Sequence, residues 1–303
     1  MFKRLVSGIQ LSGKLHLGNY LGAIKQWVEL QNDYDCYFSV VDYHALTTKP
    51  AAEEVRLNTL STLAMLIALG IDPNNVKLFI QSQVPEHAEL SWLLSPFVST
   101  GQLNRMTQYK EKADRHGQNA ALFTYPILMA ADVLIYDADV VPVGDDQIQH
   151  LELAREIARS VNSHAGNVFS EPKPLLSKAS RVMSLSDPTI KMSKSIAGSA
   201  IGLLDDEATI TRTIKRAVTD SDANSAKLSP ALKNLLVILE GVSDQKTAKK
   251  FEQLRVSGAL RYSELKEALI EETLTFLRPV QKTYQGLIKD EANLVKIAQF
   301  GTG

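Results

Sequence analysis

The first two thirds of the chain alternate between short apolar runs and longer segments in which apolar residues recur every three or four positions. The apolar runs are typical of strands buried on both faces of a sheet, and the periodic segments are typical of helices. The expected strands are residues 4–10, 36–42, 76–81 and 138–144. The expected helices are residues 18–31, 53–70, 86–97, 124–136 and 145–161. This alternation predicts the α/β class, a doubly wound parallel-sheet nucleotide-binding (Rossmann-like) domain.

The pattern changes near residue 205. Four amphipathic segments follow without a strand-like run between them, and most begin with the acidic or Ser residues that favour helix starts. They are residues 205–218, 229–242, 243–254 and 262–288. We therefore expect the Rossmann-like catalytic domain over residues 1–190 and a smaller all-helical domain over residues 191–303.

The composition is that of an ordinary globular protein, with 303 residues, 45% hydrophobic and 22% charged. A net charge of −1 means that any contact with nucleic acid needs a local basic patch. The single cysteine, Cys36, excludes intrachain disulfides and is typical of a reducing compartment. No apolar run is long enough to cross a membrane and no leader precedes the first strand, so we expect a cytoplasmic protein. Their apolar neighbours place Cys36, Trp27 and Trp92 in the expected core.

A stretch with three glycines, SGIQLSGKLHLGNY (residues 7–20), joins the first strand to the first helix. Glycine lets a ligand approach the backbone closely, and the free N–H groups of a helix start attract phosphate. His16 and Asn19 add polar side chains across one turn of this helix start. The stretch fits either a phosphate site or a simple strand–helix turn.

A second candidate lies in the apolar helix of residues 124–136. Tyr125, Met129 and Asp132 are spaced i, i+4 and i+7, so they share one helix face. Asp132 has apolar neighbours, and a buried carboxylate without partners is costly. Its donor is either another side chain of the protein or a ligand group such as an indole N–H, which only donates.

Polar residues also follow two of the expected strands. Gly144, Asp146 and Gln147 come after the strand of residues 138–144, and His44 follows the strand of residues 36–42. Open α/β sheets bind ligands at the carboxyl ends of their strands. The same residues also suit helix capping or a purely structural role.

Three basic segments allow two interpretations each, a solvated surface or a phosphate-binding patch. Lys110 and Lys112 lie in a polar run, and Arg212, Lys215 and Arg216 lie on one side of an expected helix. The third segment is the pentapeptide KMSKS, residues 191–195.

KMSKS completes a set of motifs that runs along nearly the whole chain. The others are SGIQ (7–10), HLGN (16–19), YPILMAAD (125–132), PVGDDQIQH (142–150) and AVTDSD (217–222). In this order they resemble the bacterial type of the tryptophanyl-tRNA synthetases, which are class I aminoacyl-tRNA synthetases. HLGN and KMSKS resemble the two signatures of that class.

The resemblance implies roles for individual residues. Lys191, Lys194, Lys112 and His16 would act in catalysis, where charge develops on the pyrophosphate. The positions that match ATP contacts are Gln10, Gly18, Asn19, Gly144, Asp146, Gln147, Met192, Ser193 and Ser195. The positions that match tryptophan contacts are Val6, His44, Tyr125, Met129, Asp132, Val141, Val143 and Gln147. No residue is implied as a metal ligand.

The implied activity is a ligase reaction. ATP, with Mg²⁺, would activate L-tryptophan as tryptophanyl-adenylate, and the acyl group would pass to the 3′ end of tRNA(Trp). The resemblance also implies a homodimer without a membrane partner, and predicts that the family's last helix, which packs back on the nucleotide-binding domain, is missing. Two alternatives stay open: a tyrosine-specific class I synthetase, and a non-catalytic paralogue that binds tryptophan or RNA.

Overall fold

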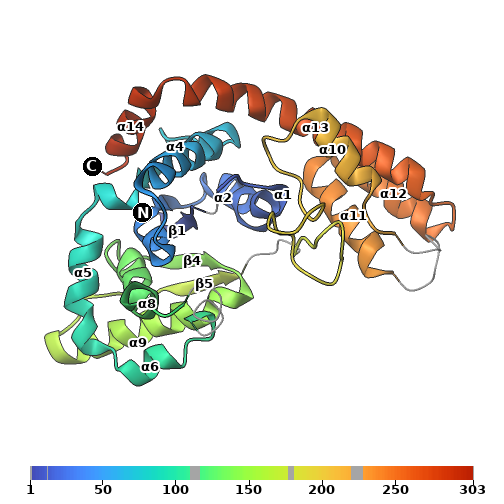
Figure 1. Cartoon of the computed structure of the whole chain (residues 1–303). Helices are drawn as coiled ribbons and strands as arrows, with labels where there is room; N and C mark the ends of the chain where they lie inside the picture. Colours follow the sequence, from blue (N-terminus) through green and yellow to red (C-terminus); the bar gives the residue numbers. More distant parts are fainter. Residues whose placement is uncertain (1, 12, 110–116, 177–180, 220–227, 303) are drawn as a thin grey trace. The chain divides into compact units, whose positions relative to one another are not determined.

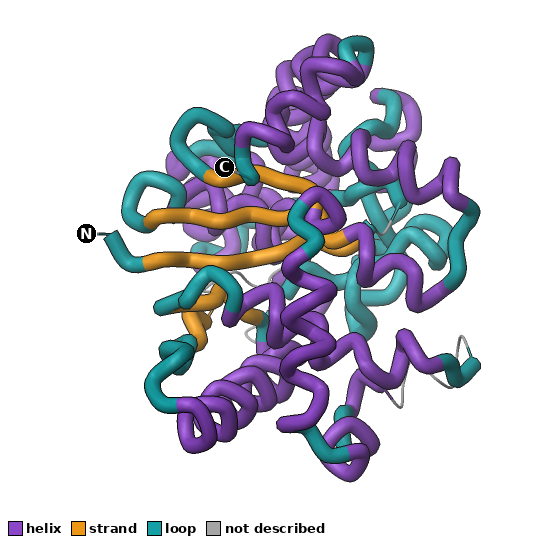
Figure 2. The backbone as a smooth tube through the Cα atoms, turned by 90° about the vertical axis from the view of Figure 1, so that its left-hand side faces the viewer, coloured by secondary structure: helices purple, strands orange, loops and turns teal. Residues whose placement is uncertain are grey.

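Five parallel strands form one sheet in the computed structural model, which describes residues 2–11, 13–109, 117–176, 181–219 and 228–302. They are β1 (Arg4–Gln10), β2 (Asp35–Val41), β3 (Lys77–Ile80), β4 (Val140–Val143) and β5 (Lys173–Leu176). The strand order is β3-β2-β1-β4-β5, and Figure 2 shows the strands side by side in orange. Because the order reverses between β1 and β4, the sheet has the switch point of doubly wound folds, and the predicted fold class is confirmed.

The chain divides into two compact units, coloured along the sequence in Figure 1. The first unit comprises Met1–Ser12, Val28–Ser177 and Asp290–Gly303, and the second comprises Gly13–Trp27 and Lys178–Lys289. A boundary between these units lies near residue 177, and the first helical turn after β1 belongs to the second unit. The domain boundary at residue 190 that the sequence suggests stays a prediction. Each unit is continuous in space but not in sequence.

The first unit surrounds its sheet with helices whose apolar faces supply the core. They are α3 (Asp42–Ala45), α4 (Ala52–Ala68), α5 (Glu86–Leu94), α6 (Thr100–Asn104), α8 (Ala120–Leu134), α9 (Ile148–Ala165) and α14 (Glu291–Phe300). Helices α8 and α9 pack on each other through small and branched residues, such as Ala130 against the cluster that contains Ile157. Cys36 and Trp27 are buried as expected, but Trp92 on α5 is 78% exposed and is not part of the core.

The second unit contains α10 (Glu207–Lys215), α11 (Pro230–Val242), α12 (Gln245–Val256) and α13 (Tyr262–Ile288), together with α1 (Leu17–Asn19). After α1 the chain forms a π-helical turn, Tyr20–Ile24, and then α2 (Lys25–Leu30), through which the division between the units passes. Ser229 and Asp244 cap α11 and α12 by accepting backbone N–H groups, as their sequence positions predict. The part of the chain that the structure describes contains no helix long and apolar enough to span a bilayer.

Helix α14 packs against the sheet of the first unit. It contacts β3 and α4 of the first unit and buries Leu294 and Ala298, and Arg56 on α4 forms an ion pair with Glu291 at 2.8 Å. Gly301 lies so close to the Leu78 backbone that a Cβ at this position would collide with it. Residues 291–301 are thus held on β3 and α4 of the first unit, and the expectation that the family's last helix is missing stays a prediction.

Candidate functional site

The first unit gathers polar groups around Asp132 on α8. The Asp132 carboxylate accepts hydrogen bonds from Gln81 Nε2 and His87 Nδ1 at Oδ1 and from His44 Nε2 at Oδ2, each at 2.7 Å. Burial would raise the pKa of Asp132, but the two histidines outweigh it and lower the pKa to about 2. Asp132 is therefore an ionised acceptor, 8% exposed, and three donors stabilise its buried charge.

The three donors leave limited room for a further one. A carboxylate offers about four lone-pair positions, and Gln81 and His87 use two on Oδ1 while His44 uses one on Oδ2. One acceptor position on Oδ2 is left by this count. Sequence reasoning raised both a structural and a ligand-binding role for Asp132, and this geometry is compatible with both.

Gln81 and His87 were not among the sequence-predicted site residues. Gln81 directly follows β3, at the edge where His44 follows β2, and it also accepts the Tyr43 N–H at 3.1 Å. His87 lies in the first turn of α5, and both side chains are 0% exposed. The available signal for Gln81 was its position just after a buried strand, which sequence reasoning used for His44 but not for Gln81. The position of His87 in α5 gave no such signal.

The other expected tryptophan contacts separate into two groups. Tyr125 lies next to His44, with ring centroids 6.2 Å apart, and its hydroxyl forms a hydrogen bond with His150 Nε2 at 2.8 Å. Tyr125 and His44 line a cavity of about 190 Å³ in the first unit, whereas Met129 is half-buried outside the cavity lining. A core cluster that includes Val133 and Leu151 contains Val6, Val141 and Val143. The exposed fractions of these three valines are 3%, 4% and 5%.

Gln10 is the last residue of β1, and Gly144, Asp146 and Gln147 follow the end of the adjacent strand β4. Gly144 precedes a single turn of 3₁₀ helix, and a Cβ at Gly144 would lie 2.9 Å from Asp146 Oδ1. Gln108 Nε2 donates to the backbone oxygen of Asp146 at 3.1 Å and to its Oδ2 at 3.2 Å. The structure thus places these residues at the carboxyl edge of the sheet that sequence reasoning expected.

The second unit brings the HLGN and KMSKS motifs together. Its residues 15–17 pair with residues 201–203: Leu17 N–H donates to Ile201 O at 2.9 Å, and Leu203 N–H donates to Leu15 O at 3.0 Å. A Cβ at Gly18 would lie 2.9 Å from the His16 ring and 3.3 Å from Met192 Cβ. A side chain at position 18 would therefore crowd His16 and Met192, where the helix start meets the KMSKS segment.

Local hydrogen bonds hold both motifs. His16 N–H donates to Asn19 Oδ1 at 3.0 Å, and Asn19 N–H donates to His16 O at 2.9 Å. In KMSKS, Met192 is 3% exposed and its N–H donates to Val182 O at 3.1 Å, while Ser193 N–H donates to Ser199 Oγ at 3.1 Å. The buried methionine anchors the segment, and Lys191, Lys194 and Ser195 around it are exposed.

The electrostatics of the second unit favour an anionic ligand. Burial, and then the charges of Lys194 and Lys191, lower the pKa of His16 to about 4, so His16 is neutral at pH 7. Desolvation lowers the pKa of Lys194 to about 8, an effect that Asp205 opposes and Lys14 increases. A bound polyanion would stabilise the charges of Lys191 and Lys194 beside His16.

The structure can test the expected basic residues and metal ligands only where it describes the chain. Lys110 and Lys112 fall in residues 110–116, which the structure does not describe. Among the residues that it does describe, no three His, Cys, Asp or Glu side chains gather as a metal site. Mg²⁺ commonly binds through one or two carboxylates, waters and substrate phosphates, so a nucleotide-borne ion needs no such cluster.

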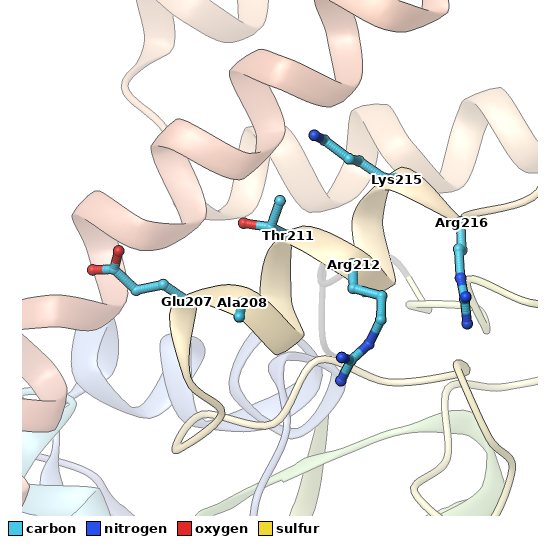
Figure 3. A pocket seen from close by; sticks show the side chains of 6 residues that line it. All are labelled: Glu207, Ala208, Thr211, Arg212, Lys215 and Arg216. Atoms are coloured by element: carbon cyan, nitrogen blue, oxygen red, sulfur yellow. The ribbon is translucent and has the colours of Figure 1, made fainter.

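A basic groove lies along α10 in the second unit (Figure 3). The groove has a volume of about 640 Å³ and is lined by Glu207, Ala208, Thr211, Arg212, Lys215 and Arg216. Arg212 and Arg216 point to the same side of the helix, whereas Lys215 points away from them, which corrects the expectation that all three share one side. Glu207 is paired with Arg278 at 2.9 Å, and the three groove cations have no ion pair within the described part of the chain.

Known proteins of one family match this chain along its length. A family model described as tRNA synthetases class I (W and Y) matches residues 2–278. The tryptophan–tRNA ligase of Oceanobacillus iheyensis is 46% identical over 298 residues, which cover 95% of this chain and 90% of that protein.

Solved structures agree with the sequence match. The tryptophanyl-tRNA synthetase of Campylobacter jejuni, complexed with ADP and tryptophan, has a TM-score of 0.86 and 35% identity, covering 98% of this chain and 93% of that one. The tryptophanyl-tRNA synthetase of Mycoplasma pneumoniae has a TM-score of 0.87 and 34% identity, covering 99% and 92%. The chain therefore belongs to the tryptophanyl-tRNA synthetases, within the class I family of tryptophan- and tyrosine-specific tRNA synthetases.

Proposed function

We propose that this protein activates L-tryptophan with ATP and transfers it to the 3′ end of tRNA(Trp). The single observation that carries the proposal is the direct packing of Gly18 in HLGN against Met192 in KMSKS, with Lys191 and Lys194 beside a neutral His16. This arrangement suits a reaction in which negative charge grows on a leaving pyrophosphate. The identities of the amino acid and of the tRNA are inferred from the family to which the chain belongs.

The chemistry needs no nucleophile from the protein. A carboxylate oxygen of tryptophan attacks the α-phosphorus of ATP, a new P–O bond forms, and the bond to the β-phosphate breaks with its electron pair leaving on pyrophosphate. The 2′-OH of the terminal tRNA adenosine then attacks the acyl carbon, and AMP leaves. The protein has to position the reactants and to place positive charge where it is needed, and Mg²⁺ would enter bound to the phosphates of ATP.

Selection of tryptophan would rest on Asp132. Its remaining acceptor position on Oδ2 suits an indole N–H, which only donates. A tyrosine hydroxyl also needs a donor for its own oxygen, and Gln81, His87 and His44 already direct their hydrogens at the carboxylate. This geometry favours tryptophan over the tyrosine-specific alternative.

The experiment that tests the function is exchange of labelled pyrophosphate into ATP with tryptophan, with tyrosine and without an amino acid. Exchange that depends on tryptophan alone is the expected result. Absence of exchange with either amino acid would overturn the catalytic proposal and favour the non-catalytic paralogue. Exchange with tyrosine would favour the tyrosine-specific alternative.

The groove on α10 is the proposed contact for the tRNA backbone. Replacing both Arg212 and Arg216 with glutamine should weaken tRNA binding and reduce the salt dependence of log Kd by about 1 per lost phosphate contact. Pyrophosphate exchange needs no tRNA and should be unchanged. The matched control is Arg255→Gln, because Arg255 is already paired with Glu252 at 2.7 Å. Equal tRNA affinity and salt slope in the double variant and the control would exclude this groove.

The proposed homodimer has a candidate face on α5. Trp92 and Leu93 are 78% and 58% exposed, and burying a large apolar side chain contributes about 1.5–3 kcal/mol. Trp92→Lys should therefore shift the molar mass measured by light scattering from dimer toward monomer. Phe300→Lys is the control, since Phe300 on α14 is also 78% exposed. An unchanged dimer in the Trp92 variant would place the interface elsewhere.

A further inference from the structure

Asp132 is connected to a second buried layer that the proposed function does not use. His87 Nδ1 lies 2.7 Å from Asp132 Oδ1, and His87 Nε2 lies 2.8 Å from the Tyr136 hydroxyl. His87 comes from α5 and Tyr136 follows the end of α8, so the chain of hydrogen bonds ties two helices together. Within it, both ring nitrogens of a fully buried histidine are engaged.

Two hydrogen bonds on opposite sides of a ring fix its rotation. Without the bond at Nε2, the His87 ring could turn about its Cβ–Cγ bond and its Nδ1–H would no longer aim at Asp132. Tyr136 itself is held by aromatic packing, with ring centroids 4.8 Å from Tyr37 and 5.6 Å from Phe79. The packed Tyr136 ring therefore holds its hydroxyl in place, and the hydrogen bond to this hydroxyl fixes the orientation of the His87 imidazole.

The position of His87 determines which acceptor position of Asp132 is free. His87 and Gln81 both donate to Oδ1, so together they keep that oxygen occupied and leave the open position on Oδ2. If His87 turned away, the carboxylate could rotate and share its oxygens differently among Gln81, His44 and a ligand. A rigid acceptor discriminates between ligands better than one that can adjust.

We propose that His87 and Tyr136 are positioning residues that hold Asp132 so that the free acceptor position on Oδ2 meets the indole N–H of tryptophan. This inference rests on the proposed function, because it assumes that Asp132 binds the indole. It assigns His87 and Tyr136 no contact with the substrate. Their effect reaches the substrate only through the carboxylate.

The test uses a tryptophan analogue in which sulfur replaces the indole N–H, β-(3-benzothienyl)alanine. This analogue has nearly the shape of tryptophan but cannot donate to Asp132. In the wild-type protein, pyrophosphate exchange should favour tryptophan over the analogue. In Tyr136→Phe, kcat/KM for tryptophan should fall about tenfold, and the loss should appear in KM. This magnitude is taken by analogy from residues that orient metal ligands, whose mutation costs about 10- to 100-fold. Exchange with the analogue and the KM for ATP should stay unchanged.

Two variants of His87 separate positioning from general stability. His87→Asn keeps an N–H donor two bonds beyond Cβ, where Nδ1 stands, and should retain most of the preference for tryptophan. His87→Leu removes the donor and should lose that preference. In the His87→Asn background, Tyr136→Phe should have no further effect, because the asparagine has no group at the Nε2 position.

The outcomes distinguish the inference from the function on which it rests. If the wild-type protein uses tryptophan and the analogue equally well, the contact between Asp132 and the indole is absent. The inference then fails together with the proposed role of Asp132, while tryptophan activation itself stands. If the wild type discriminates but Tyr136→Phe weakens tryptophan and the analogue equally, the chain only supports folding and the inference alone is overturned. Thermal unfolding of each variant identifies a loss of folded protein before the kinetics are compared.

Discussion

Replacing Lys194 with alanine is expected to lower the rate of tryptophan-dependent pyrophosphate exchange by about two orders of magnitude or more. Removal of one preorganised donor to a developing anion has a cost of this size in other enzymes. Lys194 is suited to the role because it stands with Lys191 around the half-buried His16, in the unit that holds both signatures. The measurement is the exchange rate at saturating tryptophan and ATP.

Lys14→Ala is the matched control for Lys194→Ala. Lys14 lies near enough to Lys194 to help lower its pKa, but no motif assigns it to the phosphates. It should change the rate far less, since it alters the charge of the same unit without removing the proposed donor. An equal loss in both variants would mean that general charge, rather than the placement of Lys194, sustains the rate.

The pH dependence of the wild type provides an independent check. The lysine pKa is lowered to about 8, so the ammonium is charged below this pH and loses its proton as the pH rises through it. In the free enzyme, kcat/KM for ATP should therefore fall above about pH 8. Lys194→Arg keeps its charge at all these pH values, so it should lose this alkaline decline even if its absolute rate is lower. A decline that persists in the arginine variant would assign it to another group.

The fold was largely readable from the sequence because its strands differ in burial. The apolar runs that became β1 to β4 are mostly buried or half-buried, and such runs stand out against polar loops. Strand β5, with the sequence KPLL, lies at the sheet edge and was missed because its four residues are mostly exposed. Helix α14 was missed because only ten residues and two buried side chains define it.

The site was predictable where residues lie close in sequence and not where packing joins distant segments. Spacing alone could group Tyr125, Met129 and Asp132 on one helix, but it could not bring HLGN to KMSKS, which lie more than 170 residues apart. That association came from the resemblance to a family. The donors to Asp132 could not be read from spacing either, since Gln81 approaches it from the turn after β3 and His87 from α5.

Asp132→Asn is expected to have the second large effect, on both tryptophan use and stability. The amide replaces one acceptor oxygen with an NH₂ group, and either orientation points it at a donor, His44 on one side or Gln81 and His87 on the other. Leaving buried charged or polar partners unsatisfied in this way costs about 3–5 kcal/mol of unfolding free energy. The same change should lower kcat/KM for tryptophan by about 100-fold, because the indole N–H loses an ionised acceptor.

The stability difference between Asp132→Asn and the wild type should depend on pH in a defined direction. The folded-state pKa is lowered from 3.8 to about 2, so the stabilisation is fully present above pH 4 and is lost as the pH falls toward 2. Urea unfolding at pH 7 and at pH 3 measures whether the unfolding free energies of the two proteins converge.

The control is Asp137→Asn, which alters a more exposed carboxylate that accepts the Ser170 N–H at 2.8 Å. It should lower the unfolding free energy much less than Asp132→Asn. A folded Asp132→Asn protein with an unaltered KM for tryptophan would remove Asp132 from substrate binding, and it would leave the carboxylate as a structural link among α3, β3 and α5.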